Sequence, residues 1–182
     1  MTPPPPAPDE ATTSDDDDRD RHRRRVLWAM PTGLYLIGSR SGDDINLMTA
    51  NLVVQVCIEP KLVAVALERE SVTGRLVRQS DAFTVSLLHR TDRDVVRRFV
   101  KPVTDVEKRA DGAVIALSGL PVTEVGGARL PVFANAAGYL VCALTRAEDL
   151  GSHILCIGEV TDVAGEPSEV LRMEDTRMHY GG

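Results

Sequence analysis

Three short polar side chains lie close together in one apolar stretch of the sequence, at Asn46, Thr49 and Asn51. Side chains of a β-strand point alternately to its two faces, so these three share or flank one face. Amide and hydroxyl groups can hydrogen-bond the polar edge of a bound ring. The alternative is an ordinary polar strand face, and the residue types alone favour that interpretation.

Ser71, Val72 and Thr73 begin a segment of helical periodicity that runs to Gln79. The first N–H groups of a helix lack partners and lie at the positive end of the helix dipole, so they can hold a phosphate. The hydroxyls of Ser71 and Thr73 could add hydrogen bonds to it. A plain N-cap explains the serine equally well.

A second helix is expected to begin at Asp92 and to carry Phe99. Arg98 and Lys101 flank this phenylalanine and could bring positive charge near a phosphate. Arg97 and Lys101 are four residues apart on the helix, so a solvated surface is the alternative.

Motifs of other enzyme classes are missing from the sequence. There is no GxGxxG after a first strand, no GxxxxGK[ST] and no GxSxG elbow, so neither the usual dinucleotide fold, a P-loop nor an α/β-hydrolase is supported. The histidines lack the spacing of metal ligands. They lie at His22, His89, His153 and His179.

The three cysteines, Cys57, Cys142 and Cys156, lie in apolar runs without CxxC spacing. Their odd number favours reduced thiols in a cytoplasmic protein. We expect all three to be small buried hydrophobic residues. No apolar run approaches the ~20 residues that a membrane-spanning helix needs, and the N-terminus does not resemble a signal peptide.

Charge is concentrated at the N-terminus. Residues 1–20 hold seven acidic side chains and one arginine, which account for the whole formal net charge of −6. The rest of the chain is neutral overall, which argues against a nucleic-acid-binding surface. The proline and aspartate runs predict a disordered tail over residues 1–22. The basic and then apolar run at residues 21–30 could form a short helix.

Short runs rich in Val, Ile and Leu, separated by turn residues, predict a mostly-β barrel with a few helices. The expected strands are 34–39, 47–58, 62–67, 83–88, 137–144, 154–161 and 170–172.

Several segments together resemble the flavin reductase-like, FMN-binding split-barrel family. They are MPTGLYLIGS at 30–39, NLMTAN at 46–51, VCIEPKLVAVALE at 56–68, SVT at 71–73, FTVSLL at 83–88, LPVF at 130–133 and YLVCAL at 139–144. RF at 98–99, GSH at 151–153 and GEV at 158–160 follow in the same order. The resemblance runs from about residue 25 to the C-terminus.

This resemblance implies a six-stranded Greek-key split barrel with flanking helices over residues 23–182. It implies a homodimer whose interface helps to form two flavin sites. The implied activity is hydride transfer from NADH or NADPH to FMN or FAD, with the reduced flavin passed to a flavin-dependent monooxygenase. A non-catalytic flavin carrier on the same barrel is the alternative.

The resemblance also assigns site residues. Its implied flavin contacts are Ile45, Asn46, Leu47, Met48, Thr49, Asn51, Leu52, Ala66, Leu67, Glu68, Ser71, Val72, Thr73, Arg98 and Phe99. His153 is the implied catalytic residue, near the nicotinamide; a turn histidine at a strand end is the alternative. Ser152 stands where the family often has aspartate, and the chain stops soon after Tyr180, where many relatives continue with another aromatic residue. These two departures motivate the carrier alternative.

Overall fold

The computed structural model describes residues 10–166 and 169–178 of the 182-residue chain. The chain divides into two compact units. One unit runs from Thr32 to Arg177, and the other comprises residues 1–31 and 178–182. The larger unit therefore begins nine residues after the boundary expected at residue 23, and it contains every strand of the described residues.

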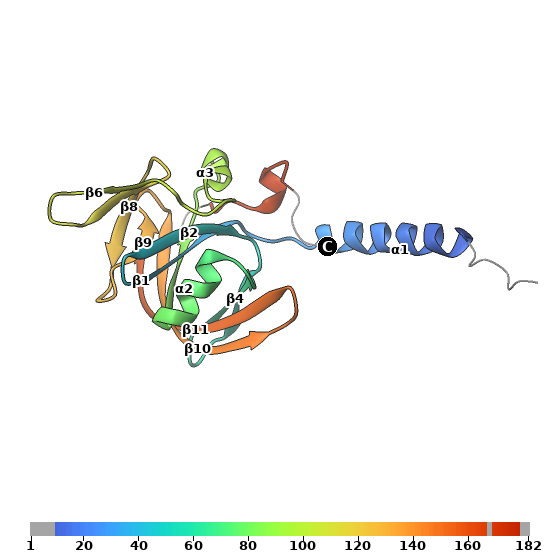
Figure 1. The fold of residues 1–182 in the computed structure, drawn as a ribbon, viewed down its shortest axis with the longest axis horizontal. Helices are drawn as coiled ribbons and strands as arrows, with labels where there is room; N and C mark the ends of the chain where they lie inside the picture. The colour runs from blue at the N-terminus through green and yellow to red at the C-terminus, as the bar shows by residue number, and fades with distance from the viewer. Residues whose placement is uncertain (1–9, 167–168, 179–182) are drawn as a thin grey trace, which may run out of the picture. The chain divides into compact units, whose positions relative to one another are not determined.

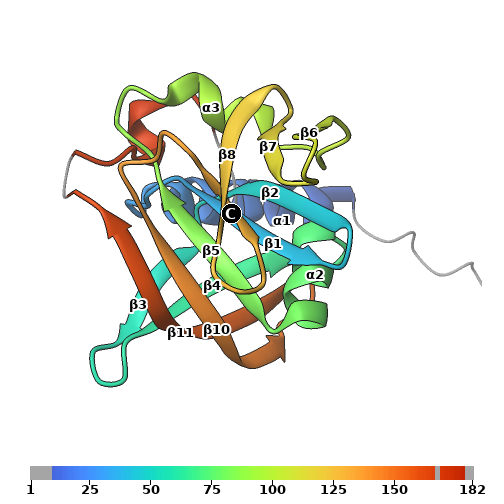
Figure 2. The same cartoon turned by 90° about the vertical axis from the view of Figure 1, so that its left-hand side faces the viewer.

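Seven antiparallel strands form one sheet that curls around a core (Figures 1 and 2). They are β1 (Tyr35–Ser41), β2 (Asp44–Ala50), β3 (Val53–Cys57), β4 (Leu62–Glu68), β5 (Ala82–Leu87), β10 (Gly138–Asp149) and β11 (His153–Gly165). The strand order is β2-β1-β5-β10-β11-β4-β3, so this sheet has one strand more than the six expected.

The extra strand arises because the run expected as one strand over 47–58 is divided. It breaks at Asn51 and Leu52, which join the two edge strands β2 and β3. The carbonyl of Leu52 accepts a hydrogen bond from the Ala66 N–H at 3.0 Å, which turns the chain toward β4. The two edges of the sheet are thus linked directly by the chain, and this link lies at the candidate site.

Aliphatic side chains from both halves of the sheet fill the core around Phe83. Gly158 is needed there, because a Cβ at this position would lie 2.6 Å from the Phe83 ring. Cys142 and Cys156 are fully buried, as expected, and burial raises the pKa of their thiols to about 12 and about 11. Cys57 departs from the expectation, since it is partly exposed at the end of β3.

A smaller sheet of four short strands was not expected from the sequence. It comprises β6 (Val106–Lys108), β7 (Val114–Leu117), β8 (Leu120–Val125) and β9 (Leu130–Phe133). Strand β9 is buried along its whole length and lies against β1 and β5 (Figure 1). The Thr84 hydroxyl donates to the Pro131 carbonyl at 2.6 Å, and the Phe133 N–H donates to the Ser86 hydroxyl at 3.1 Å.

Two short helices flank the barrel at the expected positions. Helix α2 (Val72–Ser80) packs against β1 and β2 and buries Leu76 and Val77 (Figure 2). Helix α3 (Arg93–Arg98) buries Val96. Asp92 does not cap α3 with its side chain; its carboxylate instead accepts the His89 N–H at 2.9 Å.

Helix α1 (Glu10–Trp28) differs from the disorder expected for residues 1–22 and is longer than the short helix expected at 21–30. Acidic side chains precede basic ones along it, which suits the helix dipole. Asp18 pairs with Arg21 at 2.9 Å and Asp20 with Arg24 at 2.8 Å, both at helical spacing. Residues 1–9 of the expected tail lie outside the described residues.

The segment that follows β11 adds to the barrel between the start of β1 and the end of β5. The Leu34 N–H donates to the Leu171 carbonyl at 3.0 Å, and the Leu171 N–H donates to the Leu88 carbonyl at 2.9 Å. Leu171 is fully buried. The strand expected at 170–172 is therefore present only as isolated bridges, one to each neighbour.

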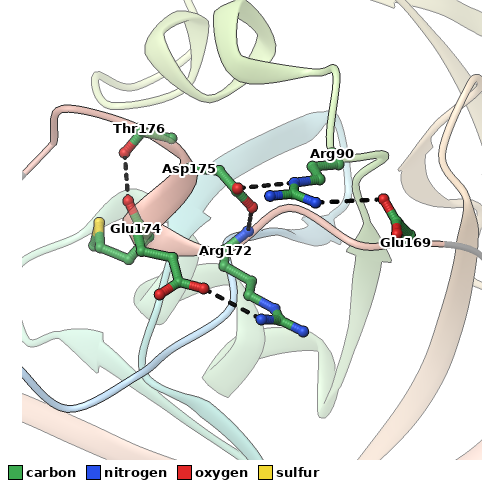
Figure 3. Close-up of polar contacts among 7 residues, drawn as sticks. Arg90, Glu169, Arg172, Glu174, Asp175 and Thr176 are labelled. Atoms are coloured by element: carbon green, nitrogen blue, oxygen red, sulfur yellow. Dashed lines mark hydrogen bonds and ion pairs between the residues drawn. The ribbon is translucent and has the colours of Figure 1, made fainter.

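Ion pairs fasten this segment to the barrel (Figure 3). The Arg90 guanidinium donates to Asp175 at 2.9 Å and also reaches Glu169 at 3.5 Å. The Arg172 N–H donates to the second Asp175 oxygen at 3.1 Å. Burial raises the pKa of Asp175, but the Arg172 N–H and the Arg90 guanidinium outweigh it and hold that pKa below its usual value.

Candidate functional site

Four parts of the chain meet at one end of the barrel: the link after β2, the end of β4, the first turn of α2 and the start of β11. Strand β4 pairs with β11 so that Glu68 lies opposite His153 and Ala66 opposite Leu155. The Ser71 N–H donates to the Glu68 carbonyl at 3.0 Å, which folds the chain from β4 directly into α2. Segments that are up to about 100 residues apart in the sequence are thus neighbours here.

The first turn of α2 is tightly packed around the Ser71 cap and carries unpaired N–H groups. The Ser71 hydroxyl accepts the Gly74 N–H at 3.0 Å and donates to the Glu68 carbonyl at 2.7 Å, so the serine is a true N-cap. A Cβ on Gly74 would lie 2.9 Å from the Ser71 oxygen, so this turn requires glycine. In the part of the chain that the structure describes, the N–H groups of Val72 and Thr73 have no acceptor. They form the positive end of the helix.

Asn46 and Thr73, both expected to contact a ligand, are instead buried against each other. The Asn46 amide nitrogen donates to the Thr73 hydroxyl at 2.8 Å, and its oxygen accepts the Val103 N–H at 2.8 Å. Asn46 is 2% exposed and Thr73 is fully buried. In this arrangement they hold β2, α2 and the chain after α3 together, and the Thr73 hydroxyl is not available at the surface.

Thr49 links β2 to α3. Its hydroxyl donates to the Val96 carbonyl at 2.7 Å, and its N–H donates to the Phe99 carbonyl at 3.0 Å. Phe99 is fully buried, while the adjacent Arg98 is exposed. The structure therefore brings Phe99 to the site as a packing residue and leaves Arg98 in solvent.

The remaining expected contacts fall into two groups. Ile45, Leu47 and Leu67 are buried in the core, so only their backbone could face a ligand. Met48, Ala66 and Val72 are partly exposed, and Leu52 and Glu68 are exposed.

His153 lies at the first position of β11, next to the turn of Gly151 and Ser152, which is held by Arg69, a residue that the sequence did not indicate. Its Nδ1 lies 2.9 Å from the Ser152 hydroxyl. Arg69 clamps this turn, since its Nε donates to the Gly151 carbonyl at 2.7 Å and its N–H to the Ser152 carbonyl at 2.9 Å. Arg69 also forms an ion pair with Asp149. The clamp fixes the backbone that carries the histidine.

A hollow of about 380 Å³ lies elsewhere, between the end of β5, the start of β10 and the end of β11. Leu87, Tyr139, Leu140 and Val163 are among its lining residues, and none of the expected cofactor contacts is. The lining is mostly apolar. We favour the α2 end as the candidate site, because unpaired N–H donors converge there.

Within the described residues, no helix is long and apolar enough to cross a membrane, and no group of histidine, cysteine and acidic side chains could hold a metal ion.

Known proteins resemble this chain over most of its length. It is 31% identical over 150 residues to the high molecular weight rubredoxin of Moorella thermoacetica, covering 79% of this chain and 62% of that protein. It is 27% identical to the NADH-dependent FAD reductase of Streptomyces globisporus, covering 80% and 76% of the two chains. The chain also spans 42% of the length of a probable flavin reductase of Rhizobium meliloti. The activities named here are those of the relatives themselves.

The fold agrees with these relatives. The structure of the Streptomyces globisporus NADH:FAD oxidoreductase SgcE6 in complex with NAD and FAD fragments superposes with a TM-score of 0.70 at 25% identity, covering 87% of this chain and 89% of that one. The expected fold class, a mostly-β split barrel, is thereby confirmed. The family model of the flavin reductase like domain matches residues 27–182. The chain therefore belongs to the flavin reductase-like family.

Proposed function

We propose that this protein is an NAD(P)H:flavin oxidoreductase that transfers a hydride from NADH or NADPH to FMN or FAD. The observation that carries the proposal is the first turn of α2, where the N–H groups of Val72 and Thr73 lack acceptors in the described part of the chain, near the end of β4 and the start of β11. A phosphate is the ligand that such a helix terminus favours.

The residues present fit a flavin nucleotide. The N–H groups at the α2 terminus would hold the phosphate, and the Ser71 hydroxyl would join them by turning its proton from the Glu68 carbonyl to the phosphate. The exposed Arg98 would add positive charge near it. Backbone groups from 45–49 and 66–68 would line the ring. Their side chains Ile45, Leu47 and Leu67 are already committed to the core, which gives the ring a rigid wall.

When bound, the flavin supplies an N5 atom that accepts the hydride, so the protein needs no acid–base pair. The work of the protein is to position the two rings and to exclude water. His153, held by the Arg69 clamp, would orient the nicotinamide on the open side of the site.

A homodimer would complete the site. The β2–β3 link and the following strand expose apolar side chains at Leu52, Val54, Val56 and Ile58, the last of them 80% exposed. Contiguous exposed apolar side chains are typical of protein interfaces. We propose that a second copy covers this strand and that the reduced flavin passes on to a flavin-dependent monooxygenase.

Stopped-flow mixing of the flavin-loaded protein with NADH and NADPH tests this function. Rapid bleaching of the flavin absorbance is the expected result. A bound flavin that stays oxidised would instead support the carrier alternative, for which the serine at position 152 is the motivating feature. A protein that takes up no flavin would contradict both functions.

A further inference from the structure

We propose that helix α1 pairs side by side and antiparallel with α1 of a second copy of this chain, with the centre of the pair between Arg19 and Asp20. The inference goes beyond the proposed function, because nearly all of α1 precedes residue 27, where the match to the family model begins. Its starting point is the order of charges over residues 15–24, which read DDDDRDRHRR.

The charges of this segment reverse sign about its centre. In two antiparallel helices related by a two-fold axis, each residue lies level with the residue equally far beyond the centre on the partner. Acidic residues are then level with basic ones throughout the segment: Asp15 with Arg24, Asp16 with Arg23, Asp17 with His22, Asp18 with Arg21 and Asp20 with Arg19. A parallel pair would instead set each charge against its own copy. The sequence therefore favours the antiparallel arrangement.

Helical geometry selects one face for this contact. At 3.6 residues per turn, one face carries four charged residues that the two-fold axis exchanges among themselves, and this pairing face is Asp16, Arg19, Asp20 and Arg23. Among the described residues, its Asp16, Arg19 and Arg23 are exposed and form no ion pair. On the opposite face, Asp18 and Arg21 already bond to each other at 2.9 Å. The pairing face is thus the one with free charges.

The pairing face offers several weak contacts at once. Each interhelical ion pair occurs twice, so Asp16 with Arg23 and Arg19 with Asp20 together make four pairs between the two copies. A single exposed ion pair contributes little. Leu27 continues the same face one turn after Arg23, and it is 51% exposed, so the partner would also cover apolar surface. Antiparallel helix dipoles attract each other as well.

The test measures the distance between two spin labels by double electron–electron resonance on the full chain at low salt. One nitroxide is attached at Leu27→Cys in a chain that also carries Cys57→Ser, since Cys57 is the native cysteine that is not buried. In the antiparallel pair, position 27 is level with the partner's Thr12. The two labels are then about 15 residues apart along the axis, which gives about 24 Å at 1.5 Å per residue and an interhelical distance of about 9 Å. A parallel pair would bring them to about 10 Å.

Charge reversal on the labelled chain separates pairing from helix stability. Asp16→Arg and Arg23→Asp each turn two attractive pairs into two repulsive ones, so each should weaken pairing by at least roughly tenfold. The double variant restores opposite charges at the same level and should regain the pairing that either single variant loses. Arg25→Asp, on the opposite face, is the matched control and should pair as the labelled chain does. Salt at about 1 M should abolish the contact, because the charges are exposed.

The inference is overturned if the labelled chain shows no distance near 24 Å, at about the precision of the rise per residue, or shows the short distance of a parallel pair. It is also overturned if the two single variants pair as the labelled chain does, or if the double variant fails to regain pairing. A plain loss of helix in the single variants predicts that last result, since a second charge reversal would not repair it. None of these outcomes bears on flavin reduction, because no residue of the pairing face belongs to the candidate site.

Discussion

The contact between Asn46 and Thr73 gives the sharpest test of how the site is held together. Replacing Thr73 with valine keeps the shape of the side chain but removes the acceptor of the Asn46 amide. Because Asn46 is 2% exposed, water cannot replace that acceptor. An unsatisfied buried donor costs about 1–3 kcal/mol. At about 2–4 °C per kcal/mol for a protein of this size, the melting temperature should fall by roughly 2–12 °C.

Urea unfolding followed by circular dichroism measures this cost by linear extrapolation, on flavin-free protein. Thr73→Ser is the control, because it keeps the hydroxyl and loses only a methyl group. The reasoning is refuted if Thr73→Val unfolds within about 0.5 kcal/mol of the wild type, the size of an ordinary surface substitution. A loss of FMN binding without any loss of stability would instead return the Thr73 hydroxyl to the phosphate.

Further outcomes are expected at other positions. Ser71→Ala should lower FMN affinity about tenfold, which is the value of one hydrogen bond to the phosphate, and leave riboflavin affinity unchanged. Equal losses of FMN and riboflavin affinity would show that the serine acts as a helix cap only. Asp175→Asn should destabilise the protein at neutral pH. Since folding lowers the pKa of Asp175, the difference from wild type should persist above about pH 4 and vanish as the pH falls through that lowered pKa, in melting curves from pH 2 to 7. A thiol reagent should label Cys57 in the native protein and reach Cys142 and Cys156 only after unfolding, because burial keeps both thiols protonated; labelling of either buried thiol in native protein would contradict this.

The sequence predicted an element well where a few consecutive residues carry its signal, such as a helix cap or a short apolar run. Helix α2 follows from the Ser71 cap and the spacing of Leu76 and Val77, and it is present from Val72 to Ser80. Most strands of the main sheet follow from short apolar runs between turn residues. The order of the weak family motifs predicted the split barrel, which the similarity to solved structures confirms.

The sequence was least informative where the pattern is short or where charge replaces apolar periodicity. Strands β6 to β9 are three to six residues long, and β6 is exposed while β9 is buried along its whole length, so they carry little alternation. Helix α1 has no apolar face; its ion pairs and its charge order along the dipole are compatible with a helix, whereas composition alone indicates disorder.

By itself, then, the sequence determined the residue types of the site, its family and the segments that build it. Only the tertiary structure decided which of those groups face each other. Asn46 and Thr73 are 27 residues apart and bond to each other, whereas the buried side-chain oxygen of Asn51 has no hydrogen-bond partner among the described residues. The physical reason is that a hydrogen bond depends on distances and angles between strands and helices far apart in sequence, which residue type and spacing do not fix.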